Sequence, residues 1–328
     1  MTRPRTLLVA SAGGHLDELA RVVPALRGER AWVVDDACDP PGDGGRVYRI
    51  SHGERDLESA RNLAEAARIL LRERPALLVS TGAGVALPFA ALARAVGGIR
   101  VVFIETAARV WRPSATARFM APLAHELFYQ WPTLASALPR GRLAALVFPA
   151  APPVEVGPAA RPERLFVAVG NRLEPFDRLL AAVAAITPAA LVTQHGHTPR
   201  SRLWRASQLS AGALHAFLPR ARFNDALAAA DAVLCHAGVG TISSALAAGH
   251  VPWVMPREAR RGEARDDHQR ETLTALSDAG LAIACEDAAT LRALWARPLR
   301  RRARVDVPVP ADLRDALARP PSRIRSRW

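Results

Sequence analysis

The residues best suited to bind an anionic ligand form a short glycine-spaced segment in the second half of the chain. Residues 236–242 read His-Ala-Gly-Val-Gly-Thr-Ile and directly follow an apolar run at 231–235. Glycines permit tight turns and close approach of a ligand, and the exposed amides at a helix N-terminus favour a phosphate group. We therefore expect His236, Gly238, Gly240 and Thr241 to form a diphosphate site that uses no metal ion.

A second glycine turn lies near the start of the chain. Ser11-Ala12-Gly13-Gly14-His15 stands where the first predicted strand gives way to a helix. Because the ordinary pKa of imidazole is about 6.5, His15 is a candidate general base. The segment lacks the full GxGxxG spacing, so a glycine turn with a polar cap is an equally good interpretation of these residues alone.

Two more polar segments follow predicted strands in the same half of the chain. Thr81-Gly82-Ala83-Gly84 comes after an apolar strand, and Glu105 ends another. Open α/β sheets gather ligands at the carboxyl ends of their parallel strands, so these segments should converge with the His15 turn. Glu105 is the competing candidate for the base, and its alternative role is that of a solvated or helix-capping carboxylate.

A polar cluster, Asp266-Asp267-His268-Gln269, opens a predicted helix late in the chain. It is either part of a ligand site or an N-cap with a charged first turn. Adjacent helical residues do not share a face, and the HExxH spacing is absent, so we predict no metal site and no metal cofactor.

These residues must be positioned by alternating strands and helices. Continuous apolar runs such as 101–104 are typical of strands buried on both faces of a parallel sheet. The sequence predicts an α/β protein with two doubly wound, Rossmann-like domains. The predicted strands are 6–11, 31–35, 46–50, 76–80, 100–105 and 126–130, then 164–170, 189–194, 231–236, 250–255 and 280–285.

Proline-rich sequence marks the expected boundary between the domains. We place an N-terminal domain at 1–150, a proline-rich linker at 151–162 and a C-terminal domain at 163–298. Repeated prolines remove amide donors and disfavour helix before them. The basic segment 299–328 is predicted to be a tail that is packed at first and then frayed.

Composition narrows the setting and the partners. The chain has 328 residues and a net charge of +13, which points to an anionic partner. Aromatic residues make up only 5%, and no nucleic-acid-binding module is recognisable, so we expect no nucleic acid. Three cysteines without CxxC spacing suit a reducing cytoplasm. No apolar run approaches the ~20 residues of a membrane span, so we expect a cytoplasmic protein, peripheral at the anionic inner face of the cell membrane.

The order of motifs resembles the two-domain GT-B glycosyltransferases that use UDP-sugars, of the family 28 type. The motifs are SAGGH, STGAG, FIE, the proline-rich linker, CHAGVGTISSALAAGHVPWVMPR and DDHQ. The chain is most similar to a fusion of the acceptor-domain and donor-domain polypeptides of bacterial exopolysaccharide transferases, or of the two-subunit enzyme that adds the second GlcNAc to a dolichol-linked sugar. This resemblance covers roughly residues 6–285. The chain also resembles the peptidoglycan GlcNAc transferase, but more distantly.

The resemblance implies an acceptor domain and a donor domain facing each other across a cleft. Acceptor contacts would come from Gly13, Gly14, Thr81, Gly82 and Gly84, with His15 or Glu105 as the base. The UDP-sugar would lie against the second domain, whose implied donor-binding residues are Gly170, Asn171, His236, Gly238, Gly240, Thr241, Ser244, Asp267, His268 and Gln269.

One position departs from the family pattern. Relatives usually carry a ribose-binding glutamate where this chain has Ser244. The expected activity is metal-independent, inverting transfer from a UDP-sugar to a polyprenyl-linked acceptor. The alternatives are transfer to a soluble natural product, epimerisation of a nucleotide sugar, and a subunit that binds UDP-sugar without turnover.

Overall fold

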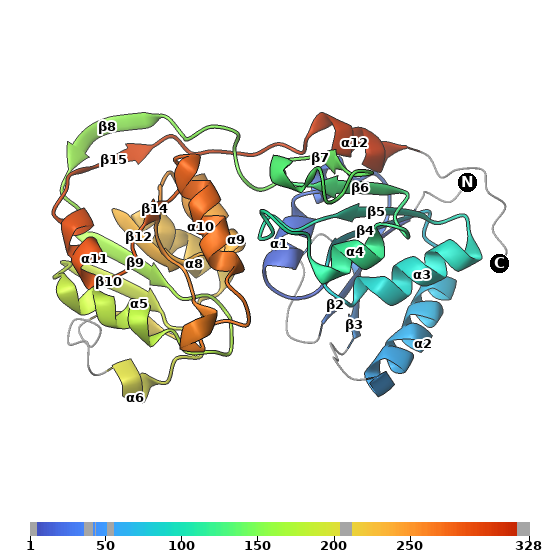
Figure 1. Ribbon diagram of the computed structural model, residues 1–328, viewed down its shortest axis with the longest axis horizontal. Coiled ribbons are helices and arrows are strands. Elements are labelled where there is room, and N and C mark those ends of the chain that lie inside the picture. Colours follow the sequence, from blue (N-terminus) through green and yellow to red (C-terminus); the bar gives the residue numbers. More distant parts are fainter. Residues whose placement is uncertain (1–4, 36–41, 43, 51–55, 204–211, 320–328) are drawn as a thin grey trace. The chain divides into compact units, whose positions relative to one another are not determined.

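The computed structural model describes residues 5–35, 42, 44–50, 56–203 and 212–319. The chain divides into two compact units (Figure 1). Unit 1 comprises Met1–Val147 and Pro308–Trp328, and unit 2 comprises Phe148–Val307. Each unit is described by itself below.

Unit 1 is built on a seven-stranded parallel sheet with the order β3-β2-β1-β4-β5-β6-β7. This order, in which the chain starts at the centre and extends to each side in turn, is that of a doubly wound fold. Its strands are β1 (Thr6–Ala10), β2 (Arg30–Asp35), β3 (Arg46–Ile50), β4 (Leu77–Gly82), β5 (Arg100–Ile104), β6 (Glu126–Tyr129) and β7 (Arg142–Leu143). Its helices are α1 (Gly14–Ala20), α2 (Asp56–Glu73), α3 (Ala86–Val96), α4 (Ala115–Met120) and α12 (Ala311–Ala318), with 3-10 turns η1 (Val23–Ala25) and η2 (Pro132–Leu134).

Strand β1 shows the burial on both faces of the sheet that its apolar run predicts. On β1, Leu7 and Val9 join a core cluster with residues of α2, α3 and α4. Leu8 points to the opposite face of the sheet and is also 0% exposed. Burial on both faces explains why β1 shows no alternation of apolar and polar residues.

Unit 2 repeats this architecture with a six-stranded parallel sheet in the order β11-β10-β9-β12-β13-β14. The strands are β9 (Arg164–Ala168), β10 (Ala190–Gln194), β11 (Ala213–His215), β12 (Ala232–His236), β13 (Trp253–Met255) and β14 (Ile283–Ala284). The helices are α5 (Asp177–Ala182), α6 (Arg200–Leu203), α8 (Arg220–Ala229), α9 (Val239–Ala247), α10 (His268–Asp278) and α11 (Ala288–Trp295), with 3-10 turns η3 (Val183–Ala185) and η4 (Ala259–Arg261).

The predicted linker differs from the structure. Half of it forms β8 (Glu155–Ala160), which pairs antiparallel with β15 (Leu299–Arg302) in a two-stranded ribbon of unit 2. Prolines are tolerated in a strand that has a partner on only one side, because the missing amide can face away from that partner. Pro158 is the one proline within β8, so part of the proline-rich segment is an edge strand and not a linker.

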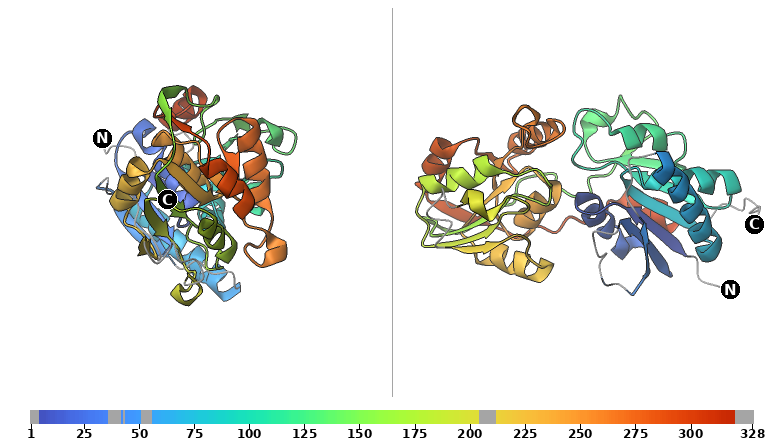
Figure 2. Two further views of the ribbon diagram at one scale, coloured as in Figure 1. Left: turned by 90° about the vertical axis from the view of Figure 1, so that its left-hand side faces the viewer. Right: turned by 90° about the horizontal axis from the view of Figure 1, so that it is seen from below.

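The segment predicted to be a tail with a packed start contains two packed elements. Its first residues form β15, and α12 then packs into unit 1, where Leu313 is 0% exposed. Arg100 of β5 donates a hydrogen bond to the carbonyl of Ala316. In Figures 1 and 2 the red helix α12 lies with the blue and green elements of unit 1. Residues 320–328 of the predicted frayed end, and Cys38, lie outside the described residues.

Along the described part of the chain, none of the helices combines the length and the apolarity needed to cross a membrane.

Removal of the Leu313 side chain tests the place of α12 in unit 1. We expect Leu313→Ala to lower the free energy of unfolding of unit 1 by about 2–5 kcal/mol, because a buried leucine is replaced by a cavity. Urea denaturation measures the change. Arg314→Ala on the same helix, at an exposed position, is the matched control and should stay within about 0.5 kcal/mol of the wild type. Equal effects of the two changes would contradict the packing of α12.

Candidate functional site

Two hydrogen bonds join His15 of α1 to Thr81 of β4. The imidazole Nδ1 lies 2.9 Å from the carbonyl oxygen of Thr81, and the Thr81 hydroxyl donates to the carbonyl of His15 over 2.6 Å. Gly82 has a φ of +117°, and a Cβ there would lie 3.2 Å from Cε1 of His15. The structure thus brings together three of the residues that the sequence predicted, and the glycine leaves room for the imidazole.

The contact with Thr81 fixes the tautomer of a neutral His15. A carbonyl oxygen can only accept, so Nδ1 must carry the proton. The lone pair then lies on Nε2, which is the nitrogen able to take a proton from another group. A neutral His15 in this position therefore accepts a proton through Nε2 and not through Nδ1.

The neighbouring glycines supply backbone geometry. Gly13 precedes α1 with a φ of +79°, which favours glycine, and no side chain caps the helix. Gly14 and Gly84 are exposed at the same carboxyl edge of the sheet.

Glu105, the competing candidate, is held by three donors. One carboxylate oxygen accepts from the amide of Thr106 at 2.9 Å, and the other accepts from the amide and hydroxyl of Ser114 at 2.8 and 2.9 Å. The side chain is only 1% exposed, and burial raises its pKa. These bonds connect the end of β5 to the start of α4, and a catalytic role for Glu105 stays a prediction.

A second buried carboxylate, Glu18 on α1, was not predicted from the sequence. It accepts hydrogen bonds from the hydroxyl of Thr106 at 2.7 Å, the amide of Ala107 at 3.2 Å and the side-chain amide of Gln130 at 2.7 Å. Burial raises the pKa of Glu18 to about 7. Its position in the sequence beside the apolar Leu19 could have indicated that Glu18 is buried, since a carboxylate there borders the buried face of the helix.

In unit 2, His236 ends β12 and fills the space left by two glycines. A Cβ on Gly170 or on Gly238 would overlap the imidazole, so both backbones approach Nε2 of the same ring. Burial, together with the charges of Arg257 and Arg172, lowers the pKa of His236 to about 3, so the ring is neutral. Among the described residues Nδ1 has no hydrogen-bond partner.

Helix α9 begins directly after this turn. Gly238 is its N-cap, and this residue has no side chain that could bond to the first amides. Gly240 and Thr241 are half-buried in the first turn. The hydroxyl of Ser244 donates to the carbonyl of Gly240 at 2.8 Å, so its hydrogen is used inside the helix. The first turn of α9 therefore presents backbone donors suited to a phosphate group.

Arg257, which follows β13, ties the surrounding loops together. It is 0% exposed, and its guanidinium donates to the carbonyls of Val169 at 3.0 Å, Glu174 at 2.8 Å and Glu263 at 3.1 Å. The ring of Phe176 lies beneath it at 4.5 Å. Burial lowers the pKa of Arg257 to about 10, so it stays charged at neutral pH. One cation thus fixes both ends of the loop that follows β9.

The predicted donor residues at the start of α10 are anchored to the same region. The side-chain oxygen of Gln269 accepts from the amide of Arg257 at 3.0 Å, and Asp267 accepts from the amide of Ala259 at 2.8 Å. His268 bonds to Asp266 through Nδ1, and Asn171 is exposed. Gln269 and Asp267 thus each use a side-chain oxygen to hold the loop before α10.

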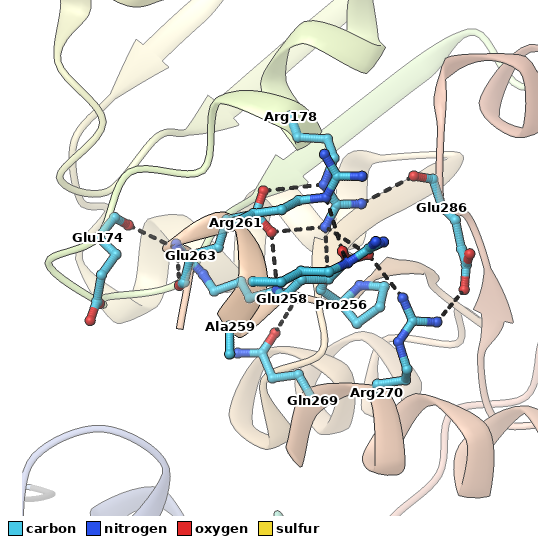
Figure 3. Close-up of polar contacts among 12 residues, drawn as sticks. Glu174, Arg178, Pro256, Glu258, Ala259, Arg261, Glu263, Gln269, Arg270 and Glu286 are labelled. Carbon is cyan, nitrogen blue, oxygen red and sulfur yellow. Dashed lines mark hydrogen bonds and ion pairs between the residues drawn. The ribbon is translucent and has the colours of Figure 1, made fainter. Parts of the chain in front are cut away.

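A network of charges holds the outer side of this loop (Figure 3). The carboxylate of Glu258 accepts from Arg260 at 2.6 Å, Arg261 at 2.9 Å and Arg270 at 2.9 Å. Arg178 binds Glu263 at 2.9 Å. The pKa of Glu258 is lowered to about 2 because its arginine partners outweigh its burial. Sequence reasoning missed Arg257 and this network, since nothing local indicates which arginines are buried.

Within the described ranges, no three His, Cys, Asp or Glu side chains are grouped so that they could hold a metal ion.

Arg257 is expected to be essential for the order of unit 2. Arg257→Met should lower the free energy of unfolding of unit 2 by about 2–4 kcal/mol, because several buried carbonyls lose their hydrogen-bond donor. Removal of the buried charge offsets part of this loss. Arg257→Lys should not restore stability, since an ammonium group lacks the planar fork that reaches separate carbonyls. Urea denaturation followed by tryptophan fluorescence measures both, with Arg222→Met, at an exposed position on α8, as the control. Full rescue by lysine would contradict the need for the fork.

The sequence is similar to known proteins of oligosaccharide and peptidoglycan biosynthesis. The family model "Oligosaccharide biosynthesis protein Alg14 like" matches residues 56–147. A UDP-N-acetylglucosamine--N-acetylmuramyl-(pentapeptide) pyrophosphoryl-undecaprenol N-acetylglucosamine transferase from Verminephrobacter eiseniae is 28% identical over 319 residues, covering 85% of each chain.

Solved structures share the fold across both units. Acinetobacter baumannii MurG has a TM-score of 0.58 at 17% identity and covers 89% of this chain and 90% of its own. A putative UDP-N-acetylglucosamine 2-epimerase from Listeria monocytogenes has a TM-score of 0.61 at 14% identity, covering 89% and 87%. The chain therefore has the GT-B fold and is similar in sequence to an N-acetylglucosamine transferase, which confirms the resemblance to UDP-sugar glycosyltransferases predicted from its motifs.

Proposed function

We propose that the protein is an inverting, metal-independent glycosyltransferase that moves a sugar from a UDP-sugar to a hydroxyl group of a polyprenyl-linked glycan precursor. The observation that carries this proposal is the similarity to a transferase whose name specifies a pyrophosphoryl-undecaprenol acceptor, because the similarity extends over 85% of both chains.

The donor diphosphate binds at the first turn of α9. Support comes from the uncapped amides after Gly238 and from the close approach of Gly170 and Gly238 to His236. Aligned amides and the partial positive charge of the helix N-terminus stabilise the departing UDP in place of a metal ion. With Ser244 bonded inside the helix, the ribose is held by other groups.

His15 acts as the base. Nε2 takes the proton of the acceptor hydroxyl, whose oxygen attacks the anomeric carbon from the face opposite the leaving UDP, so the configuration inverts. The acceptor is bound by the glycine turns of unit 1. The net charge of +13 favours binding of the protein to an anionic lipid surface, where a polyprenyl-linked acceptor resides.

Epimerisation of a nucleotide sugar is the second candidate, because a putative epimerase shares the fold with a TM-score of 0.61. The two differ in their need for an acceptor. Incubation with the nucleotide sugar alone leaves the donor sugar unchanged for a transferase and converts it for an epimerase.

The proposal predicts selective donor binding and metal-free transfer. In a thermal-shift panel of nucleoside diphosphates and nucleotide sugars, UDP and UDP-sugars should raise the melting temperature, since ligands that bind the native state stabilise it. Radiolabelled sugar should then pass to a polyprenyl-diphosphate-linked acceptor with EDTA present. A flat response to uridine nucleotides, or transfer abolished by EDTA and restored by Mg²⁺, would contradict the proposal.

The base assignment predicts a separation of turnover from donor affinity. We expect His15→Ala to lower kcat by about 10²–10⁴-fold, as is usual for loss of a general base, and to leave the UDP dissociation constant within about twofold. Transfer assays and calorimetry measure the two quantities. His215→Ala, at an exposed position, is the matched control. Near-native turnover of His15→Ala together with an inactive Glu105→Gln would assign the base to Glu105.

A further inference from the structure

The loop that follows β9 contains a paired arginine and glutamate two residues apart. Nε and Nη2 of Arg172 each lie 3.1 Å from a different carboxylate oxygen of Glu174. Both side chains are about one-third exposed, at 29% and 31%. The bond from Arg172 lowers the pKa of Glu174, so this carboxylate is ionised at neutral pH. Two parallel bonds of this kind are also how a guanidinium binds a phosphate group.

The chain just before this pair lies against the same histidine as the N-cap of α9. Gly170 and Gly238 both approach Nε2 of His236, so their backbones are close to one another. Arg172 follows Gly170 by two residues, a span of at most about 7 Å between Cα atoms. An arginine side chain of ordinary length can therefore reach the amides after Gly238. His236, 7% exposed and with Nδ1 unpartnered among the described residues, is a buried polar group at this same place.

The backbone of the loop is held by a buried group, whereas the two paired side chains are partly exposed. Arg257 holds the carbonyls of Val169 and Glu174, one before Arg172 and one after it. Arg257 itself is buried and directed at carbonyls, and Arg178 is bonded to Glu263. Arg172 is thus the partly exposed cation of this loop, and its one recorded carboxylate partner in the described chain is Glu174.

We propose that Arg172 binds the diphosphate of the donor and that Glu174 competes with the diphosphate for the same guanidinium. The inference rests on the proposed donor site at α9. Binding exchanges the Arg172–Glu174 pair for an Arg172–phosphate pair, so Glu174 weakens the affinity for every phosphate-bearing ligand. This competition does not affect the contacts between the protein and the nucleoside.

Calorimetry with UDP and ligand-observed NMR with uridine test the exchange. Arg172→Met should weaken UDP binding about 10-fold, in keeping with loss of a charge-assisted hydrogen bond, and leave uridine binding unchanged. Glu174→Gln should strengthen UDP binding about 2–5-fold, the range of an exposed ion pair, again without effect on uridine. The double variant should match Arg172→Met alone, because the competitor matters only while the arginine is present.

Arg164→Met is the matched control. Arg164 forms a similar partly exposed pair with Asp231, at 2.7 Å, but at the amino end of β9. Arg164→Met should leave the affinity for UDP unchanged. Unaltered UDP affinity in Arg172→Met, or weaker binding in Glu174→Gln, would overturn the inference, the latter by making Glu174 a group that orients Arg172. Failure of the wild type to bind UDP would instead overturn the proposed donor site.

Discussion

Burial of the Arg257 charge is the constraint on which the candidate donor site depends. A guanidinium removed from water needs compensation in the interior, and Arg257 obtains it from four backbone carbonyls and the ring of Phe176. Those carbonyls belong to loops after β9 and β13. Satisfying one charge therefore sets the geometry of two loops at once, and the glycines around His236 and the start of α10 are placed as a result.

Much of the fold could be predicted because parallel strands buried on both faces leave long apolar runs. The bounds of β3 were predicted as observed, and those of β1 and β2 within one residue. The two-residue strand β7 and the three-residue strand β11 are too short to give a pattern. Strand β8 was predicted as linker because the prolines within and around it conceal a strand that needs pairing on only one side.

The candidate site could be predicted in outline but not in its connections. Glycines at strand ends indicated where the chain must turn tightly, and His15, Thr81 and Gly82 do meet. The contacts of Gln269 and Glu18 depend on partners distant in the sequence or on the depth of burial, neither of which has a local signature. Long-range pairing of buried polar groups is set by packing.

The return of α12 to unit 1 has a consequence for synthesis of the protein. Unit 2 is inserted, in terms of chain order, between residue 147 and residue 308 of unit 1. A nascent chain normally folds its first domain while the rest is being translated. Here the first domain lacks Leu313 and Leu317 until all of unit 2 has been translated, so the second domain can finish folding before the first.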